Sequence, residues 1–403
     1  MFEEAEKELG VTYPKGFKAS GINAGMKVSG KPDMAMIVSD VEAAAAGTFT
    51  QNHVAAAPVY VSKEVARRGK ARAIIANSGC ANACTGEGGM KDARTMAELA
   101  AKEVGCAAED VFVASTGVIG VPLDMAKISK GIREAGAALS YEGSHAAAHS
   151  IITTDTHPKG GSCEVEIGGV PVRFGVIAKG SGMIRPNMAT MLCFITTDAA
   201  IDAGLLQEAL SAAVSYSFNM ISVDGDMSTN DSCIILANGE AGNPKITEKN
   251  DDYNLFYTVL LKLCQGVAQQ IASDGEGATK FITIHVKGTK IFEDAKTVGM
   301  SVAKSPLVKT AFFGEDPNWG RVIAAVGYAE APMDPEKTVV TFGGIPVYAH
   351  GVPVPFDMEA MKHVMAAHDI VIDIDMGLGS EDATVWTCDF SYDYVKINGE
   401  YHT

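Results

Sequence analysis

The stretch KGSGMIRPNMATMLCFI (residues 179–195) joins two apolar segments through a glycine-rich loop. The segment before the loop, VPVRFGVIAK, and the segment after it, MLCFI, contain the β-branched and aromatic residues typical of buried strands. We therefore expect a strand that ends at Lys179, an irregular loop, and a new strand that starts at Thr190. By local rules alone, Thr190 is an ordinary β-branched residue at the beginning of that strand.

Runs typical of strands alternate with amphipathic helical patterns along most of the chain. Buried strands are predicted for AMIVSD, ARAIIAN and VFVAST, and hairpins are predicted to turn at Gly168 and Gly343. Helices are predicted at Met90–Val104, Met125–Ala137, Ile201–Tyr216, Asn254–Ala272 and Asp357–Ala367. After about residue 280 the pattern is dominated by strands, in KFITIHVKG, VIAAVGYA, TVVTF, DIVIDIDMG and TVWTCDFSYDYVKI. We therefore expect an α/β protein with a C-terminal α/β subdomain over about residues 281–403.

The composition is typical of a globular protein in a reducing compartment. The 403 residues are 47% hydrophobic and 20% charged, which excludes a disordered chain. The formal net charge of −16 argues against a nucleic-acid partner or an anionic membrane, because both select a basic face. The acidic start MFEEAEKELG is unlike a signal peptide, no apolar run approaches about 18 residues, and the eight cysteines are scattered. We expect a cytoplasmic protein.

Several candidate binding motifs lack a feature that their chemistry requires. The loop DGDMSTND (224–231) has oxygen ligands at alternate positions, but it lacks the glycine at the sixth position and the glutamate at the twelfth of an EF-hand. We interpret it as a polar turn before the strand SCIILAN, and a ligand-binding role stays open. Cys80 and Cys84 have no second pair at zinc spacing, and His145 and His149, one helical turn apart, are expected to face solvent. The sequence predicts no metal site.

Thr190 can also support a specific chemistry. A threonine hydroxyl held against the carbonyl of Ala189 can attack it and form an ester, which water then cleaves. The new N-terminal threonine would carry both a nucleophile and a base, because a free α-amino group has a pKa of about 7.7–8.0. The turn after VFVAS offers two donors for an oxyanion, the Thr116 hydroxyl and the Gly117 N–H. A plain turn at the end of a strand explains Thr116 and Gly117 equally well.

The chain resembles the ornithine acetyltransferase family of arginine biosynthesis, also called glutamate N-acetyltransferase. The resemblance spans essentially the whole sequence in ordered, distinctive segments. They are GFKASGINAGMK (16–27), AAGTFTQNHVAAAPV (45–59), ANSGCANACTG (76–86), ASTGVIG (114–120), ITTDTHPK (152–159), KGSGMIRPNMATML (179–192), SVDGDMSTNDS (222–232), SDGEGATK (273–280), KTAFFGEDPNWGR (309–321) and DFSYDYVKINGEYHT (389–403).

The resemblance implies that the chain cuts itself between Ala189 and Thr190, into an α chain (1–189) and a β chain (190–403). Thr190 would then take the acetyl group from N2-acetyl-L-ornithine as an acyl-enzyme and pass it to L-glutamate in a ping-pong cycle. This transfer requires no cofactor, and the use of acetyl-CoA as a further acetyl donor stays open. The implied fold is an αββα sandwich of the aminopeptidase and ornithine acetyltransferase type with a smaller C-terminal α/β domain, assembled as an α2β2 heterotetramer.

The resemblance also implies roles for residues that match the family's positions. Thr116 and Gly117 match its oxyanion hole. Its substrate-binding positions match Thr153, Lys179, Thr190, Glu276, Asn398 and Thr403. Lys179 is suited to neutralise a carboxylate or developing charge, and Glu276 is suited to orient the Thr190 amine or bind a cationic substrate nitrogen. Asn398 and Thr403 would close the pocket.

Two other interpretations of the residues stay open. An N-terminal-threonine amidohydrolase, such as an aminopeptidase, would share the self-cleavage but would let water deacylate Thr190. A non-catalytic protein that binds a small molecule would keep Ala189 and Thr190 as the ordinary start of a strand, and its 224–231 loop would hold a cation.

Overall fold

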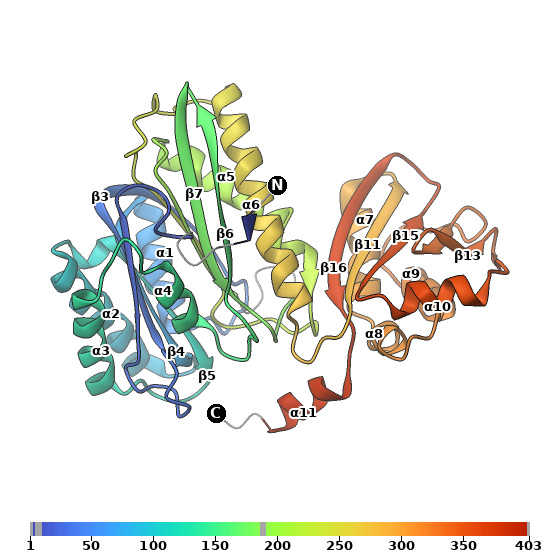
Figure 1. The fold of residues 1–403 in the computed structure, drawn as a ribbon, viewed down its shortest axis with the longest axis horizontal. Helices are drawn as coiled ribbons and strands as arrows, with labels where there is room; N and C mark the ends of the chain where they lie inside the picture. Colours follow the sequence, from blue (N-terminus) through green and yellow to red (C-terminus); the bar gives the residue numbers. More distant parts are fainter. Residues whose placement is uncertain (1–2, 5–9, 186–190, 401–403) are drawn as a thin grey trace.

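The computed structural model of the chain describes residues 3–4, 10–185 and 191–400 (Figure 1). Two sheets, each with its own helices, lie side by side in Figure 1. The larger sheet is formed by strands from the first part of the chain, up to Ala237. The smaller sheet is formed mainly by strands between Phe281 and Cys388. The mixed α/β class predicted from the sequence is confirmed.

In the described residues, nine strands form the larger sheet, in the order β1-β6-β7-β8-β10-β3-β4-β5, with β2 paired to β3. They are β1 (Glu3–Glu4), β2 (Phe17–Ile22), β3 (Met34–Phe49), β4 (Lys70–Cys80), β5 (Val111–Val118), β6 (Lys159–Ile167), β7 (Val170–Lys179), β8 (Leu192–Thr197) and β10 (Ser232–Ala237). The long strand β3 pairs with β2 and β4 and, through its second half, with β10. Its register with β4 shifts between Val38 and Ala43, an irregularity of the kind that bends a strand. Strand β3 therefore joins the two halves of the sheet.

These two halves enclose a shared apolar core. Ile37 of β3 and Phe112 of β5 belong to the same buried cluster as Phe194 of β8 and Ile234 of β10. Helices α1, α2 and α3 cover the outer face of β3–β5, while α5 and α6 cover that of the other half (Figure 1). This is the αββα sandwich that the family resemblance implied. Its helices are α1 (Ala57–Arg68), α2 (Gly86–Val104), α3 (Met125–Ala137), α4 (Ser144–Ile151), α5 (Ala203–Ser215) and α6 (Asp251–Ser273).

Strand β3 shows how the sequence specifies the layers. Met34 and Met36 belong to the cluster under α2 and α3, whereas Ala35 and Ile37 belong to the core between the two halves. Successive side chains of a strand point to opposite faces, so a strand between two apolar layers must be apolar at every position. This explains the uninterrupted run MAMIV.

The smaller sheet has the order β14-β13-β12-β15-β11-β16-β9 in the described residues. Its strands are β9 (Ile221–Ser222), β11 (Phe281–Thr289), β12 (Val339–Phe342), β13 (Ile345–Ala349), β14 (Val352–Pro353), β15 (Asp369–Asp375) and β16 (Glu381–Cys388), and its helices are α7 (Phe292–Ala303), α8 (Pro306–Phe313), α9 (Trp319–Gly327) and α10 (Met358–Ala366). Strand β9 precedes α6 in the chain but pairs with β16, and thereby ties this sheet to the larger part. Helix α11 (Tyr392–Glu400) follows β16 and returns toward the larger part (Figure 1).

Two segments predicted as strands are helical. VIAAVGYA lies largely in α9, where the Asn318 side chain accepts a hydrogen bond from the Arg321 N–H and caps the helix. The buried residues Val322, Ala325 and Val326 follow helical spacing, which a short apolar run does not distinguish from a strand. The end of the last predicted strand, YDYVKI, lies in α11. The predicted start of a strand at Thr190 lies outside the described residues, and β8 is described from Leu192.

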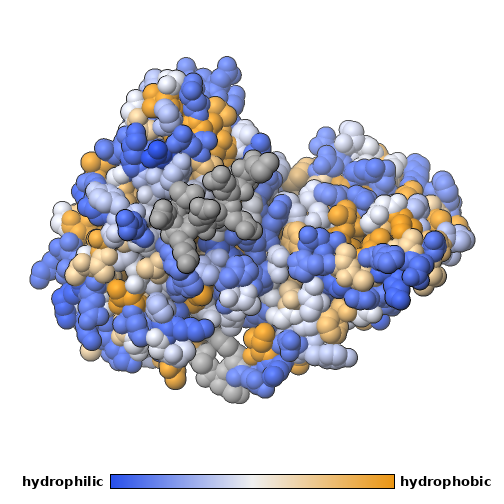
Figure 2. All heavy atoms as spheres, viewed as in Figure 1, coloured by the Kyte–Doolittle hydropathy of each residue, from blue (hydrophilic) through white to orange (hydrophobic). Residues whose placement is uncertain are grey.

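The surface is largely hydrophilic on the face shown in Figure 2, where apolar patches are separate from one another. None of the helices in the described part of the chain combines the length and the apolar character that crossing a bilayer requires.

Candidate active site

Six of the residues predicted for the site line one pocket of about 140 Å³. They are Thr116, Gly117, Thr153, Lys179, Glu276 and Asn398. They come from the end of β5, the loop after α4, the end of β7, the loop after α6, and α11. Three further predicted residues, Ala189, Thr190 and Thr403, lie outside the described residues. The pocket therefore gathers positions that are up to 282 residues apart in the chain, from Thr116 to Asn398.

Gly117 occupies a backbone position that excludes other residues. Its φ is +132°, a conformation that residues with a Cβ rarely adopt, and a Cβ built there would lie 2.3 Å from the Gly79 carbonyl carbon of β4. The close approach of β4 and β5 at their carboxyl ends thus requires glycine at this point. Thr116, just before it, is buried and lies at the pocket wall.

Lys179 brings a buried amine to the same wall. It is the last residue of β7, and its Nζ lies 3.5 Å from the Thr116 Oγ1. Burial lowers the pKa of Lys179, an effect that the carboxylate of Asp155 opposes and the Lys159 ammonium reinforces. Near neutral pH, an ammonium group whose pKa is lowered in this way gives up its proton more readily than an exposed lysine does.

Asp155 links two segments of the pocket. Its Oδ2 accepts the Thr153 N–H at 3.0 Å, and its Oδ1 accepts the Gly180 N–H at 2.7 Å. The fully buried Lys159 lies between Asp155 and Asp274, with Nζ 2.7 and 2.6 Å from their oxygens. Burial by itself would raise the pKa of Asp155, but Lys179 and Lys159 hold it at about 2. Asp155 therefore stays ionised and keeps Thr153 and the loop after Lys179 in place.

Glu276 is fixed from two sides. Its backbone N–H donates to the Ser181 carbonyl at 2.9 Å, and the Ser181 hydroxyl donates to the Asp274 carbonyl at 2.7 Å. The Asn398 amide of α11 donates to Glu276 Oε2 at 2.8 Å. Gly182 passes so close that a Cβ there would lie 2.4 Å from the Glu276 carboxyl group. Gly182 thus makes room for this carboxylate.

The loop 224–231, for which the sequence left a ligand-binding role open, also lines the pocket through Ser228, Thr229 and Asn230. Asn230 Nδ2 donates to the Ala81 and Ser115 carbonyls at 2.6 and 2.8 Å and so joins the ends of β4 and β5. Asp224 accepts the N–H groups of Met183 and Ile184, and Asp231 accepts the N–H of Met191. The alternating polar pattern of this loop was the visible signal, but its partners are backbone groups of the pocket.

No three His, Cys, Asp or Glu side chains of the described residues converge in a way that could hold a metal ion. His145 and His149 lie one turn apart on α4, as predicted, with 3.1 Å between their Nε2 atoms. Their helix packs against β2 and β3, and neither histidine lines the pocket.

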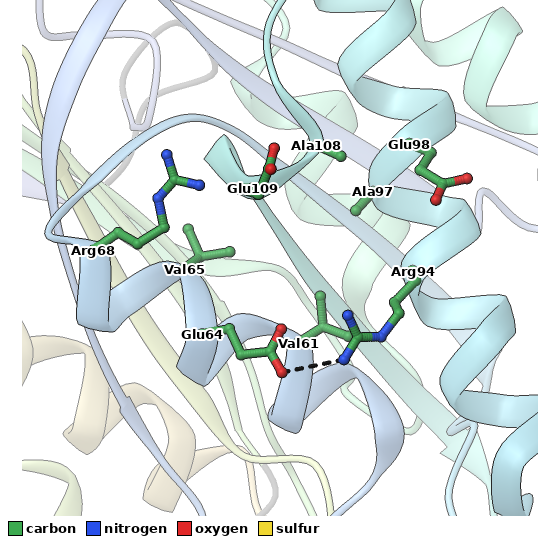
Figure 3. Close-up of a pocket in the computed structure, with 9 residues that line it drawn as sticks. All are labelled: Val61, Glu64, Val65, Arg68, Arg94, Ala97, Glu98, Ala108 and Glu109. Carbon is green, nitrogen blue, oxygen red and sulfur yellow. Dashed lines mark hydrogen bonds and ion pairs between the residues drawn. The ribbon is translucent and has the colours of Figure 1, made fainter.

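Another hollow, of about 380 Å³, lies between α1, α2 and the short helix η1 (Ala108–Asp110) (Figure 3). Arg94 pairs with Glu64 at 3.2 Å at its edge, as the dashed line in Figure 3 shows. Its lining has no serine, threonine, cysteine or lysine side chain, and none of the residues predicted for the site belongs to it.

Comparisons with known proteins show the family to which the chain belongs. The model of the ArgJ family matches residues 18–403. The chain belongs to the ArgJ family. Arginine biosynthesis bifunctional protein ArgJ of Symbiobacterium thermophilum is 52% identical over 396 residues, which cover 98% of both chains. The protein of the same name from Caldanaerobacter subterraneus is 48% identical, again with 98% of both chains covered.

Two solved structures are also similar to parts of this chain. A crystal structure of the ArgJ bifunctional protein of Bacillus halodurans is 41% identical, with a TM-score of 0.50, and covers 52% of this chain and 98% of its own. A structure of ornithine acetyltransferase with ornithine, from Mycobacterium tuberculosis, is 38% identical over 48% of this chain and all of its own, with a TM-score of 0.43. As an ArgJ protein, the chain is an acyltransferase of arginine biosynthesis, which confirms the enzyme class that the resemblance implied.

Proposed function

We propose that this ArgJ protein cuts itself before Thr190 and then transfers the acetyl group of N2-acetyl-L-ornithine to L-glutamate through an acetyl-Thr190 ester. The observation that carries the proposal is the convergence of Thr116, Lys179, Glu276 and Asn398 on one pocket. Met183, shortly before the 186–190 segment, lines the same pocket. Met191, directly after this segment, is bonded to the loop that lines it. The nucleophile would thus belong to a segment that is attached at the pocket on both sides.

Self-cleavage would proceed in two balanced steps. The Thr190 Oγ bonds to the Ala189 carbonyl carbon, the Ala189–Thr190 C–N bond breaks, and the hydroxyl proton ends on the freed amine. Water then hydrolyses the ester, which leaves a carboxylate on Ala189 and the hydroxyl on Thr190. The length of the Bacillus halodurans chain supports this proposal: it matches about half of this chain over nearly all of its own length, as a separate β chain of residues 190–403 would.

Acetyl transfer would reuse the same hydroxyl. The Thr190 Oγ attacks the acetyl carbonyl of N2-acetylornithine, its proton passes through the α-amine to the leaving nitrogen, and ornithine departs. The amine of glutamate then attacks the ester, and N-acetylglutamate leaves. Each tetrahedral oxyanion would be stabilised by the Thr116 hydroxyl and the Gly117 N–H, with Lys179 Nζ beside Thr116. The reaction exchanges one amide for another, so it requires no cofactor.

Substrate binding would use the charged groups of the pocket. We assign Lys179 to a substrate carboxylate or to developing negative charge, and Glu276 to a cationic nitrogen. Thr153 and Asn398 flank these groups, and Thr403 would complete the pocket. We extend the proposal to acetyl-CoA as a second acetyl donor, because full-length relatives are named bifunctional. The α2β2 assembly and the cytoplasmic location stay predictions.

One experiment tests the reaction directly. Purified protein is incubated with N2-acetylornithine labelled in its acetyl group, and intact-mass and peptide spectrometry then locate the label. We expect two chains that meet between Ala189 and Thr190, with the label on Thr190 until glutamate is added. Release of the label as acetate at the same rate without glutamate would instead identify an amidohydrolase. Label on another side chain, or an uncut active chain, would refute the proposal.

A further inference from the structure

A third hollow, of about 390 Å³, adjoins the candidate active site. Its walls come from the loop between β2 and β3, the end of β4, the loop after α4, and α11. The active pocket itself measures about 140 Å³, whereas pockets for organic ligands usually measure about 300–1,000 Å³. The active pocket therefore suits a small reacting group, and the hollow beside it offers room for the remainder of a larger ligand.

The hollow and the active pocket meet at two places. Thr153 lines both of them. Gly79 of the hollow pairs with Gly117 of the active pocket where β4 and β5 end, and a Cβ on Gly117 would lie 2.3 Å from the Gly79 carbonyl carbon. On α11, Ile397 lines the hollow and the next residue, Asn398, lines the active pocket. A ligand whose reactive end lies beside the predicted oxyanion hole can therefore extend into the hollow.

Much of the wall of the hollow is apolar. Met26 and Ile397 are half-buried there, and Val28 is 97% exposed, which places it at the open rim. The loop that carries Met26 and Val28 is fixed by Asp33, whose Oδ2 accepts the N–H groups of Met26 and Lys27 at 2.6 and 3.0 Å. The apolar wall is therefore a built feature of this loop, and it suits an aliphatic ligand segment.

Lys27 adds a positive charge to this wall. Its Nζ donates to the Pro32 and Ile152 carbonyls at 2.6 and 2.8 Å, which uses two of the three donors of an ammonium. It forms no ion pair with a carboxylate of the described residues, and neither does the exposed Lys31 nearby. Burial lowers the pKa of Lys27 to about 8, so the amine is still mostly protonated at neutral pH. In a chain of net charge −16, two such ammonium groups favour an anionic ligand at this rim.

We propose that the hollow binds the aliphatic arm of an acyl-CoA thioester, with the phosphates of the nucleotide at the rim beside Lys27 and Lys31. The assignment rests on the part of the proposed function that makes acetyl-CoA a second acetyl donor. The acetyl C–S bond breaks, the acetyl carbon bonds to the oxygen of the proposed nucleophile, and the hydroxyl proton ends on the sulfur of the released thiol. N2-acetylornithine has no such arm and carries one carboxylate and one ammonium, so its transfer does not require the hollow.

The test compares V28E with V28Q, two side chains of nearly equal size that differ in charge. Val28 is almost fully exposed, so neither change should disturb the fold. A carboxylate beside the bound phosphates repels them, so we expect kcat/KM for acetyl-CoA in V28E to fall at least about tenfold below that of V28Q. The kcat/KM for N2-acetylornithine should agree within about twofold in the two variants, because this donor has no net charge.

Two shorter thioesters separate the arm from the phosphates. S-acetylpantetheine keeps the arm without any phosphate, so V28E and V28Q should use it equally well. S-acetyl-N-acetylcysteamine lacks most of the arm, and each buried methylene contributes about 0.8 kcal/mol, so the wild-type kcat/KM should be at least about tenfold lower with it than with S-acetylpantetheine. Equal use of these two thioesters would overturn the assignment of the hollow to the arm.

Binding of free CoA, measured by calorimetry, provides a readout that does not depend on turnover. We expect the wild-type protein and V28Q to bind CoA and V28E to bind it at least about tenfold more weakly. No binding to the wild type, or equal binding to V28E and V28Q, overturns the inference. The proposed function fails separately, if N2-acetylornithine leaves no acetyl label on the wild-type protein. CoA binding that V28E weakens would support the hollow in that case too.

Discussion

Asn398 of the last helix donates a 2.8 Å hydrogen bond to the carboxylate of Glu276, 122 residues earlier in the chain. Helix α11 has no buried residue of its own. It starts from a firmly held turn, in which the Ser391 hydroxyl donates to the Gly277 carbonyl and Asp389 accepts the N–H and hydroxyl of Thr279. The Asn398 bond therefore fixes the far end of the helix over the pocket and orients Glu276 at the same time.

Replacing Asn398 with alanine should weaken catalysis at the substrate-binding stage. A hydrogen bond to a charged group contributes about 1.5–3 kcal/mol, so we expect kcat/KM for N2-acetylornithine to fall by roughly 10- to 100-fold, mainly through KM. Steady-state kinetics with both substrates checks this result. The control is V395A on the same helix, where the side chain is 70% exposed and does not line the pocket. Equal kinetics for N398A and V395A would contradict the assignment.

The Thr116 hydroxyl should contribute to the rate of acetyl transfer. T116V keeps the size and the β-branch of the side chain, so β5 should remain intact. Loss of one oxyanion donor is expected to lower kcat by about 10²–10³ while KM changes little. T116S is the matched control, because it keeps the hydroxyl and should retain most of the activity. A wild-type kcat in T116V would return Thr116 to a purely structural role.

Thr190 should be required both for self-cleavage and for acetyl transfer. T190A removes the hydroxyl, so we expect a single chain of about 42 kDa on denaturing electrophoresis and no detectable transfer. T190S keeps a hydroxyl and should still be cut, but more slowly. Mass spectrometry of both variants after a long incubation checks the cleavage point. Transfer by an uncut T190A chain would contradict the proposed function.

Asp155 should contribute strongly to the stability of the fold. D155N leaves Lys159 with one carboxylate fewer in a fully buried network, and the loss of one partner of a buried ion pair costs about 3–5 kcal/mol. Denaturant unfolding followed by circular dichroism measures this change. The exposed pair of Lys249 and Glu208 provides the comparison, since E208Q should change the free energy of unfolding by less than about 1 kcal/mol. If D155N and E208Q change the free energy of unfolding by similar amounts, the network around Asp155 contributes little to the stability of the fold.

Titration of the same carboxyl group should make the free energy of unfolding fall at acid pH. The pKa of Asp155 is about 2 in the folded protein, below its ordinary value of 3.8, so the unfolded chain binds the proton more tightly. Its contribution is fully present above about pH 4 and is lost as the pH falls from 4 toward 2. Unfolding free energies of wild type and D155N, measured at intervals from pH 5 to 2.5, should therefore converge at the acid end. A constant difference over that range would show that Asp155 does not titrate there.

The amino-acid sequence by itself determined the class of the fold and most of its elements. The apolar run of β3, the capped helices and the Gly168–Gly169 turn follow from local chemistry, because strand alternation, capping and tight turns depend on near neighbours. The ordered segments also sufficed to name the family. The sequence failed at α9 and α11, where short apolar runs fit a helix or a strand and only packing decides.

Only the tertiary structure decided which polar residues meet. The pocket residues come from four separate parts of the chain: Thr116, Lys179, Glu276 and Asn398. They meet because the two halves of the larger sheet pack together and because α11 returns toward that sheet. The 224–231 loop was visible in the sequence as a polar motif, but its two terminal aspartates, Asp224 and Asp231, bind backbone N–H groups. Every residue except proline carries such a group, so no side-chain pattern identifies the partner, and only the folded chain brings it to the carboxylate.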